Sequence, residues 1–299
     1  IYIGGNDSMD TVYNLSEYCK VNNLDYYIMG APKTVDNDLN LTDHCPGFGS
    51  AAKYIATTIS ELERDINVYD VPAVTIVEIM GRNAGWLTAA AALARVNGGS
   101  GAYLIYLCEK DFDNDRFIQD VKDMLAKKPG VLVAISEGIK DSTGAYVSDQ
   151  TSSGAVDNFG HKYIAGAARA LEQLVRDKIG CKVRAVELNL MQRSAAHIAS
   201  ETDIMESLML GQKAFNGAVN GETAKMSAIK RLSNDPYRVE FILVPVSEVA
   251  NHEKVVPMDW ITPEGNDVTD EMMAYLKPLI LGETNLKYEN GIPKQYRLY

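Results

Sequence analysis

Short apolar runs alternate with amphipathic segments along most of the chain, and this alternation is typical of α/β proteins. The apolar runs predict β-strands at residues 1–3, 26–29, 73–79, 102–107, 131–135, 184–188 and 240–244. Several of these runs are almost wholly apolar, as expected of parallel strands that helices cover on both faces. The pattern therefore predicts an α/β fold with mainly parallel sheets.

The segments between these strands carry apolar residues at helical spacing. Residues 51–66 place Ile55, Ile59, Leu62 and Ile66 on one helical face. Similar patterns predict helices at residues 8–20, 117–126, 161–178, 203–217 and 267–283. Residues 141–160 are polar and rich in glycine and serine, which predicts a loop.

In parallel sheets ligands bind beyond the carboxyl ends of the strands, so the residues after each strand are the first candidates for chemistry. The first strand is followed by Gly4-Gly5-Asn6-Asp7-Ser8, which leads into a predicted helix. A glycine-rich turn at a helix N-terminus can cradle a phosphate, although a plain tight turn explains the glycines equally well. The carboxylate of Asp7 would repel a phosphate unless a metal ion lies between them or the carboxylate serves to exclude a ligand.

The second strand is followed by residues 32–38, which hold Lys33, Thr34, Asp36 and Asp38. In a tight turn the two carboxylates would converge, and they would then split their pKa values or share a Mg²⁺ ion. The ammonium of Lys33 would stabilise the charge on a phosphoryl group during its transfer. A solvated loop with Asx-turns is the alternative.

Three further strand ends carry polar side chains: Met80-Gly81-Arg82, Glu137, and Arg184 with Arg193. An arginine between glycines can bind a phosphate through its planar guanidinium group. A carboxylate after a strand can accept hydrogen bonds from sugar hydroxyls. Taken singly, each residue is explained as well by a surface ion pair or a helix cap. Together, the strand ends favour phosphoryl transfer to a hydroxyl.

Composition narrows the class of partner. The formal net charge is −11, which argues against nucleic acid or an anionic membrane as the main partner, because both require basic patches. The four cysteines are widely spaced with no CxxC pair, which fits a reducing compartment, so a cytoplasmic location is expected. The sequence has no apolar run of the length that a membrane span requires.

Five motifs occur in a fixed order along the chain: GGNDS, PKTVDND, MGR, SEG and RAVELNLMQR. With them, the sequence resembles the phosphofructokinase family over nearly its whole length, and TDHCPGFGSAAKYIA adds to the resemblance. The resemblance implies a phosphofructokinase fold of two Rossmann-like three-layer lobes. It assigns residues 1–47 and 192–250 to a donor-binding and catalytic lobe, residues 48–191 to a sugar-phosphate-binding lobe, and residues 251–299 to a tail that packs on the lobes.

The resemblance also implies a role for each residue of the catalytic loop. Asp36 would be the base that takes the proton from the 1-hydroxyl of fructose 6-phosphate, and Thr34 would hydrogen-bond the transferring phosphoryl group. Asp38 would organise Mg²⁺, with Asn6 standing where the family usually has a metal-binding aspartate. Gly4 to Ser8 would contact the donor phosphates.

The same resemblance assigns the sugar site. Met80, Gly81 and Arg82 would line it, Glu137 would accept hydrogen bonds from the sugar hydroxyls, and Arg193 would bind the 6-phosphate. Arg184 would reach that phosphate from a neighbouring subunit, which implies a homo-oligomer, either a dimer or a tetramer. Two departures affect this site: Leu190 replaces a family histidine, and Ala73 replaces an intersubunit arginine of the bacterial ATP-dependent enzymes.

Two positions indicate the phosphoryl donor. ATP-dependent members of the family have glycine where this chain has Asp7 and Lys33, whereas the pyrophosphate-dependent branch has aspartate and lysine. A carboxylate at position 7 would repel the α-phosphate of a nucleotide, and Lys33 would stabilise the charge on the leaving phosphate. Pyrophosphate is therefore the expected donor. The alternatives are an ATP-dependent 6-phosphofructokinase and a non-catalytic subunit that binds sugar phosphates.

The chain begins with an apolar strand and without the glycine-rich phosphate loop that opens other members of the family. We therefore expect the donor-binding lobe to be incomplete, and the chain either to be inactive on its own or to be a fragment of an active enzyme.

Overall fold

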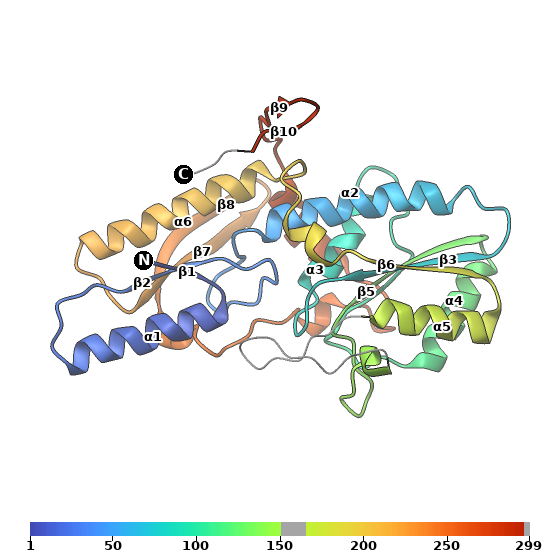
Figure 1. Cartoon of the computed structure of the whole chain (residues 1–299), viewed down its shortest axis with the longest axis horizontal. Helices are drawn as coiled ribbons and strands as arrows, with labels where there is room; N and C mark the ends of the chain where they lie inside the picture. The colour runs from blue at the N-terminus through green and yellow to red at the C-terminus, as the bar shows by residue number, and fades with distance from the viewer. Residues whose placement is uncertain (151–165, 296–299) are drawn as a thin grey trace. The chain divides into compact units, whose positions relative to one another are not determined.

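The computed structural model describes residues 1–150 and 166–295, and the chain forms two compact units (Figure 1). Unit 1 comprises Ile1–Tyr54, Arg193–Lys254 and Tyr275–Tyr299, and unit 2 comprises Ile55–Gln192 and Val255–Ala274. Each unit contains one four-stranded sheet. The predicted α/β class with mainly parallel sheets is confirmed.

The sheet of unit 1 has the strand order β1-β2-β7-β8. Its strands are β1 (Tyr2–Gly4), β2 (Met29–Pro32), β7 (Lys225–Asn234) and β8 (Tyr237–Pro245). The first three are parallel, and β8 is antiparallel to β7. The helices α1 (Asn6–Val21) and α6 (Glu201–Val219) cover opposite faces of this sheet (Figure 1). On β2, Gly30 faces Met9 of α1, and the neighbouring Met29 faces Gly217 of α6.

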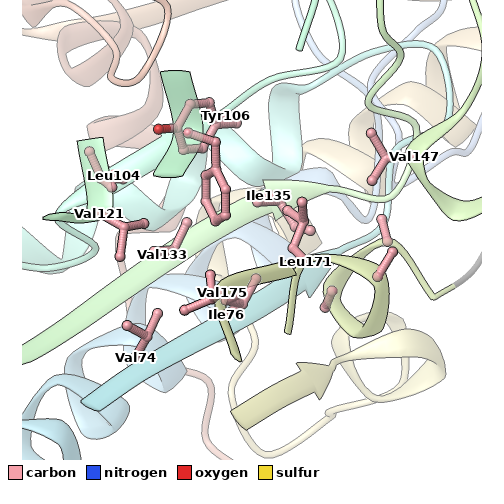
Figure 2. Close-up of a cluster of buried hydrophobic side chains, with 14 of the residues drawn as sticks. Val74, Ile76, Leu104, Tyr106, Val121, Val133, Ile135, Val147, Leu171 and Val175 are labelled. Carbon is pink, nitrogen blue, oxygen red and sulfur yellow. The ribbon is translucent and has the colours of Figure 1, made fainter. Parts of the chain in front are cut away.

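The sheet of unit 2 is wholly parallel, in the order β4-β5-β3-β6. Its strands are β3 (Ala73–Ile79), β4 (Leu104–Tyr106), β5 (Gly130–Ser136) and β6 (Lys182–Glu187), and the helices α4 (Asn114–Leu125) and α5 (Ala167–Ile179) cover one face. All seven residues of β3 and of β5 are buried. Figure 2 shows Val74, Ile76, Val133 and Ile135 of these strands packed against Leu171 and Val175 of α5. Each such aliphatic side chain contributes about 1.5–3 kcal/mol when it is fully buried.

The remaining elements are short, apart from α2 (Phe48–Ile66), along which the chain passes from unit 1 into unit 2. They are α3 (Trp86–Ala89), α7 (Asp270–Leu276), β9 (Tyr288–Glu289), β10 (Ile292–Pro293), and 3₁₀ turns at Ala90–Arg95, Val147–Gln150, Asn189–Arg193, Val246–Glu248, Met258–Trp260 and Lys277–Ile280. No helix in the described part of the chain has the length and apolar character needed to cross a bilayer.

The structure corrects three predicted elements. The second strand is Met29–Pro32 rather than residues 26–29, because Tyr26 and Tyr27 are exposed and the buried stretch starts at Met29. The predictions omit β7, whose lysine, arginine and serine residues interrupt its apolar pattern. The single helix expected at 267–283 is a short α-helix followed by a 3₁₀ turn, since Pro278 cannot donate a helical hydrogen bond.

The strand predicted at residues 73–79 is found with the same bounds, and the remaining predicted helices and strands are found with shifted ends. Residues 151–160 of the predicted loop and residues 161–165 of the predicted helix lie outside the described residues.

Candidate functional site

Two loops of unit 1 lie side by side at the carboxyl ends of neighbouring strands. The strands β1 and β2 are parallel, with Gly4 opposite Pro32. The backbone N–H of Lys33 donates to the carbonyl of Gly4 at 2.9 Å. A Cβ atom on Gly5 would lie 3.6 Å from Cβ of Thr34. The turn of residues 4–8 and the loop of residues 32–38 therefore form one continuous surface.

The turn at residues 4–8 brings the backbone to the N-terminus of α1. A Cβ atom on Gly4 would lie 2.0 Å from Oγ of Ser8, so only glycine fits there. The N-cap of α1 is Gly5, and no side chain caps the helix. The first backbone N–H groups of a helix have no partner within it and attract anions. The exposed Asp7 places a negative charge in this first turn.

Asn6 has its side chain turned towards another loop of unit 1. Its Oδ1 accepts a hydrogen bond from the backbone N–H of Asn251 at 2.9 Å. Nδ2 of Asn251 in turn donates to Oδ1 of Asp10 at 2.9 Å. In this structure the amide of Asn6 therefore ties the start of α1 to the loop that follows β8.

The loop of residues 32–38 turns sharply at its end. Asn37 is buried and has a positive φ of 58°, a left-handed conformation that asparagine tolerates better than most residues. Burial and, secondly, the negative charge of Asp36 raise the pKa of the Asp38 carboxyl to about 6. Oδ1 of Asp38 is buried and has no hydrogen-bond partner among the described residues. The turn thus brings two carboxylates together.

Hydrogen bonds connect this turn and the segment after it to Cys45, Lys254 and Tyr275, which lie in different parts of the sequence. The side chain of Asn37 accepts from the backbone N–H of Cys45 at 3.0 Å and donates to the hydroxyl of Tyr275 at 2.9 Å. That hydroxyl donates to the carbonyl of Asp43 at 2.7 Å. Nζ of Lys254 donates to the same carbonyl, also at 2.7 Å. The sequence carries no signal for these contacts, because no local pattern links the three segments.

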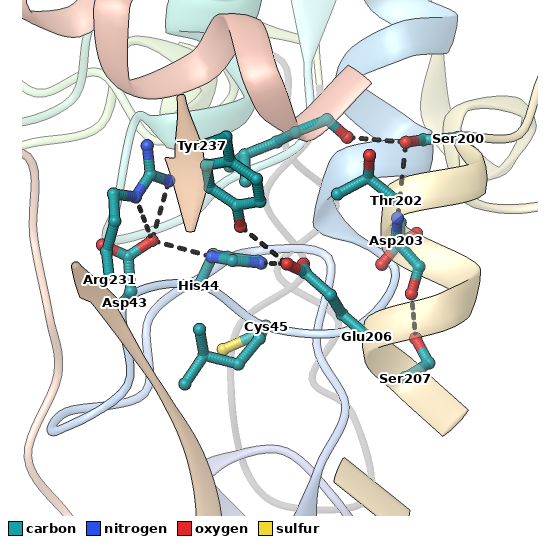
Figure 3. A network of polar contacts seen from close by, with 12 residues as sticks. Asp43, His44, Cys45, Ser200, Thr202, Asp203, Glu206, Ser207, Arg231 and Tyr237 are labelled. Carbon is teal, nitrogen blue, oxygen red and sulfur yellow. Dashed lines mark hydrogen bonds and ion pairs between the residues drawn. The ribbon is translucent and has the colours of Figure 1, made fainter. Parts of the chain in front are cut away.

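A buried network of charged and polar side chains follows the turn in unit 1 (Figure 3). Nδ1 of His44 lies 2.7 Å from Oδ2 of Asp43, and its Nε2 lies 2.5 Å from Oε2 of Glu206. Arg231 donates to the same oxygen of Asp43, at 3.0 Å from Nε and 2.8 Å from Nη2. The hydroxyl of Tyr237 donates to Oε1 of Glu206 at 2.7 Å. The network connects the loop, α6 and the β7–β8 hairpin.

The electrostatics of this network favour the charged forms of His44 and Asp43. Burial alone would lower the pKa of His44, but hydrogen bonds to Asp43 and Glu206 outweigh it and raise that pKa above its ordinary value. For Asp43, burial is likewise outweighed, and His44 and Arg231 lower its pKa. The imidazolium is therefore held between two carboxylates.

In unit 2, the loops that follow β3 and β5 are in direct contact. The backbone N–H of Gly81 donates to Oε1 of Glu137 at 3.2 Å. A Cβ atom on Gly138 would lie 1.8 Å from the carbonyl oxygen of Arg82, so glycine is required there. Nε of Arg82 is buried and has no hydrogen-bond partner within the described ranges. The backbone N–H of Met80 donates to the side chain of Gln192 at 3.2 Å. This cluster presents a carboxylate and a guanidinium together.

Arg184 and Arg193, the other two arginines predicted for the sugar site, lie outside the loops that follow β3 and β5. Arg184 is exposed on the edge strand β6 and is paired in register with Thr75, four positions before the carboxyl end of β3 at Ile79. Its Nη1 donates to the hydroxyl of Tyr69 at 2.6 Å. Arg193 is exposed at the end of the Asn189–Arg193 turn and is assigned to unit 1.

Each unit thus carries its own cluster of polar groups at the carboxyl ends of its strands. Unit 1 presents helix N-terminal amides, the exposed ammonium of Lys33 and the paired carboxylates, a set that suits a polyanionic ligand together with a base or a metal ion. Unit 2 presents the carboxylate and the guanidinium, which suit a ligand that carries both hydroxyl groups and an anion.

The comparison with known proteins identifies a family. The phosphofructokinase family profile matches residues 1–218. A pyrophosphate–fructose 6-phosphate 1-phosphotransferase from Xanthomonas campestris pv. campestris is 40% identical over 301 residues, which cover 100% of this chain and 72% of that protein. The enzyme of the same name from Halomonas elongata is 39% identical, over 99% of this chain and 71% of its own length.

Solved structures show the same similarity. The crystal structure of a pyrophosphate-dependent phosphofructokinase from Marinobacter aquaeolei superposes with a TM-score of 0.86 at 36% identity, and covers 98% of this chain and 70% of that one. The corresponding protein from Nitrosospira multiformis gives a TM-score of 0.83 at 33% identity, over 100% of this chain and 73% of that one.

Proposed function

Since the chain belongs to the phosphofructokinase family, we propose that it transfers a phosphoryl group from pyrophosphate to the 1-hydroxyl of fructose 6-phosphate. The products are fructose 1,6-bisphosphate and phosphate, and the reaction is reversible. One observation carries the proposal: the turn of residues 4–8 and the loop of residues 32–38 form one surface that presents Lys33 and the paired carboxylates. Four relatives named for this activity align over 98–100% of the chain.

The charges on this surface favour pyrophosphate over ATP. Asp7 puts a carboxylate beside the amides at the start of α1, where it repels a further phosphate of a nucleotide. Lys33 is exposed on the adjacent loop, and its ammonium can stabilise the charge on the leaving phosphate. An ATP-dependent phosphofructokinase of Streptomyces coelicolor is less similar, at 28% identity over 78% of the chain.

The loop of residues 32–38 supplies the groups that act on the sugar hydroxyl and on the transferred phosphoryl group. Asp36 takes the proton from the 1-hydroxyl of the sugar as that oxygen attacks the phosphorus atom. The backbone N–H of Asp36 donates to Oγ1 of Thr34 at 3.2 Å, so the threonine hydroxyl can give its own hydrogen to a phosphoryl oxygen. Lys33 stabilises the negative charge that leaves with the second phosphate.

The residues present fit a divalent cation such as Mg²⁺. Among the described residues there is no group of three or more His, Cys, Asp or Glu side chains that could enclose a metal. Magnesium, however, is usually held by one or two carboxylates together with substrate phosphates and water. Asp38 offers a buried oxygen that has no hydrogen-bond partner in the described part of the chain, and we assign it to the cation. Asn6 would contribute less, since its oxygen already accepts the N–H of Asn251. When bound, the cation neutralises phosphate charge.

For the sugar phosphate, we assign the cluster in unit 2. Glu137 accepts hydrogen bonds from the sugar hydroxyls, while Met80, Gly81 and Arg82 line the site, and Arg193 binds the 6-phosphate. Arg184 lies exposed on an edge strand, away from the carboxyl end of β3, and this position suits a contact with a substrate bound to a second copy of the chain. We therefore also propose a cytoplasmic homo-oligomer.

Donor preference tests the proposed function. Binding of pyrophosphate and of ATP to this chain is measured by calorimetry with Mg²⁺ present, and turnover is measured with fructose 6-phosphate and each donor. We expect pyrophosphate but not ATP to bind, and pyrophosphate rather than ATP to be the donor in any turnover. A preference for ATP in either measurement would refute the donor assignment. Binding of fructose 6-phosphate without binding of either donor would instead support the non-catalytic alternative.

A further inference from the structure

Two residues that have no part in the proposed chemistry, Lys254 and Tyr275, are hydrogen-bonded to the Asp36–Asp38 turn. We propose that Lys254 and Tyr275, acting through Asn37, are positioning residues that hold the two carboxylates in their reactive arrangement. This inference rests on the proposed function, which places Asp36 and Asp38 at the reacting groups.

Lys254 attaches the turn at several points. Its backbone N–H donates to the carbonyl of Asp38 at 2.7 Å. Its Nζ donates to the carbonyls of Thr42 and Asp43, at 3.0 and 2.7 Å, and lies 3.5 Å from Oδ1 of Asn37. One residue therefore holds both ends of the segment from Asp38 to Asp43.

Tyr275 completes the support through Asn37. The tyrosine hydroxyl accepts a hydrogen bond from Nδ2 of Asn37 and donates one to the carbonyl of Asp43. The other end of the asparagine amide accepts the backbone N–H of Cys45. Both ends of the amide are thus used, and they keep Asn37 in its left-handed conformation.

The hydrogen bonds of Lys254 and Tyr275 counteract a repulsion within the turn. The turn holds two carboxylates close enough to interact, and their mutual repulsion favours an opening of the turn. The hydrogen bonds of Lys254 to the carbonyl of Asp38 and to the segment up to Asp43 oppose this opening. Loss of either support would let the base move relative to the sugar hydroxyl, and a displacement of about 1 Å can cost about 100-fold in rate.

Two variants and a matched control test the inference. Tyr275→Phe removes the hydroxyl and keeps the ring, and Lys254→Met removes the charge and keeps the chain length. The control is Tyr106→Phe in unit 2, which also loses a buried hydroxyl that donates to a side-chain carboxylate, that of Asp120 at 2.8 Å. Hydrogen–deuterium exchange is followed in peptides that cover residues 33–45 and 114–125, and kcat and KM are measured with pyrophosphate.

In Tyr275→Phe and Lys254→Met, we expect amide exchange in residues 33–45 to be about tenfold faster, with residues 114–125 unchanged. We expect kcat to fall about 10- to 100-fold while KM for both substrates stays within about twofold. Tyr106→Phe should change neither kcat nor the exchange of residues 33–45. A loss confined to KM, or an equal loss of kcat in the control, would overturn the inference.

The exchange measurement does not need an active protein. If the parent chain prefers ATP to pyrophosphate, the proposed function is contradicted, and exchange still decides whether Lys254 and Tyr275 hold the turn. Unchanged exchange in residues 33–45 of Tyr275→Phe would reject the inference whatever the activity, because this conservative variant keeps the packing of the ring.

Discussion

At the scale of single residues, the site depends on charges that ordinary packing would not place together. Asp36 and Asp38 occupy one turn, and Lys33 is exposed at the start of the same loop. A protein gains no stability from close carboxylates, since each raises the cost of ionising the other. We therefore attribute this arrangement to the proposed chemistry at the turn, and the role of each residue can be tested separately.

Replacement of the proposed base should affect rate rather than binding. In Asp36→Asn we expect kcat with pyrophosphate to fall about 100- to 10,000-fold, because an amide cannot accept the proton of the sugar hydroxyl. KM for fructose 6-phosphate should change little. Steady-state kinetics measures both values, and a kcat within about threefold of the parent would contradict the assignment of Asp36 as the base.

Replacement of Lys33 should weaken the use of pyrophosphate specifically. Lys33→Ala removes the ammonium beside the leaving phosphate, and we expect kcat to fall about 100- to 1,000-fold. The matched control is Lys20→Ala, which removes an exposed lysine at the far end of α1. If both variants lose activity equally, net charge rather than the position of Lys33 is responsible.

At the scale of elements, side-chain carboxylates hold the starts of helices in both units. Asp203 of α6 accepts hydrogen bonds from the backbone N–H of Gly47 at 2.8 Å and of Ser50 at 3.1 Å, and thereby caps the start of α2. Asp113 caps α4 by accepting one hydrogen bond from the N–H of Arg116 at 2.8 Å. The sequence indicates neither partner of Asp203, because α2 and α6 are far apart along the chain.

The two caps should differ in their contribution to stability. Asp203→Ala leaves two N–H groups at the start of α2 without their acceptor, and we expect a loss of about 2–3 kcal/mol in the free energy of unfolding. Asp113→Ala removes a single exposed cap and should cost about 1 kcal/mol. Urea denaturation measures both losses. A smaller loss for Asp203→Ala than for Asp113→Ala would contradict the capping role.

The buried network around His44 should make stability depend on pH. The pKa of His44 in the folded protein is raised above its ordinary value of 6.5, so the folded state holds the proton more tightly than the unfolded state does. The stabilisation is complete below about pH 6.5 and is lost as the pH rises through the folded-state pKa. Asp43 acts in the opposite sense: its pKa is lowered, so its contribution is lost only at strongly acidic pH.

Chemical denaturation between about pH 6 and pH 9 measures this dependence. We expect the free energy of unfolding of the parent protein to fall as the pH rises, and we expect this fall to disappear in His44→Gln. The control is His197→Gln, which replaces an exposed histidine. A parent protein whose stability rises over this interval would show that His44 is not held as an imidazolium.

At the scale of the whole molecule, the proposed function assigns Arg184 to a substrate bound on a second copy of the chain. Arg184→Ala should raise KM for fructose 6-phosphate about tenfold or more, because a charged contact to the 6-phosphate is lost. If Arg184 acts on a neighbouring subunit, a mixture of Arg184→Ala and Asp36→Asn chains forms some sites with both residues intact. The activity of the mixed sample should then exceed the sum of the separate samples.

If the activity of the mixed sample equals the sum of the separate samples, Arg184 acts on the substrate of its own subunit or has no part in the site.

The sequence by itself determined the α/β class, most of the strands and helices, and the family, because these depend on local hydrophobic periodicity and on short motifs at strand ends. It also predicted a chemical role for each polar residue of the two loops. Only the tertiary structure decided that Asn37 is held by Tyr275 and Lys254, that Asp203 caps α2, and that His44 lies between two carboxylates. These contacts join segments far apart along the chain, and the free energy that forms them depends on burial and geometry that no local pattern records.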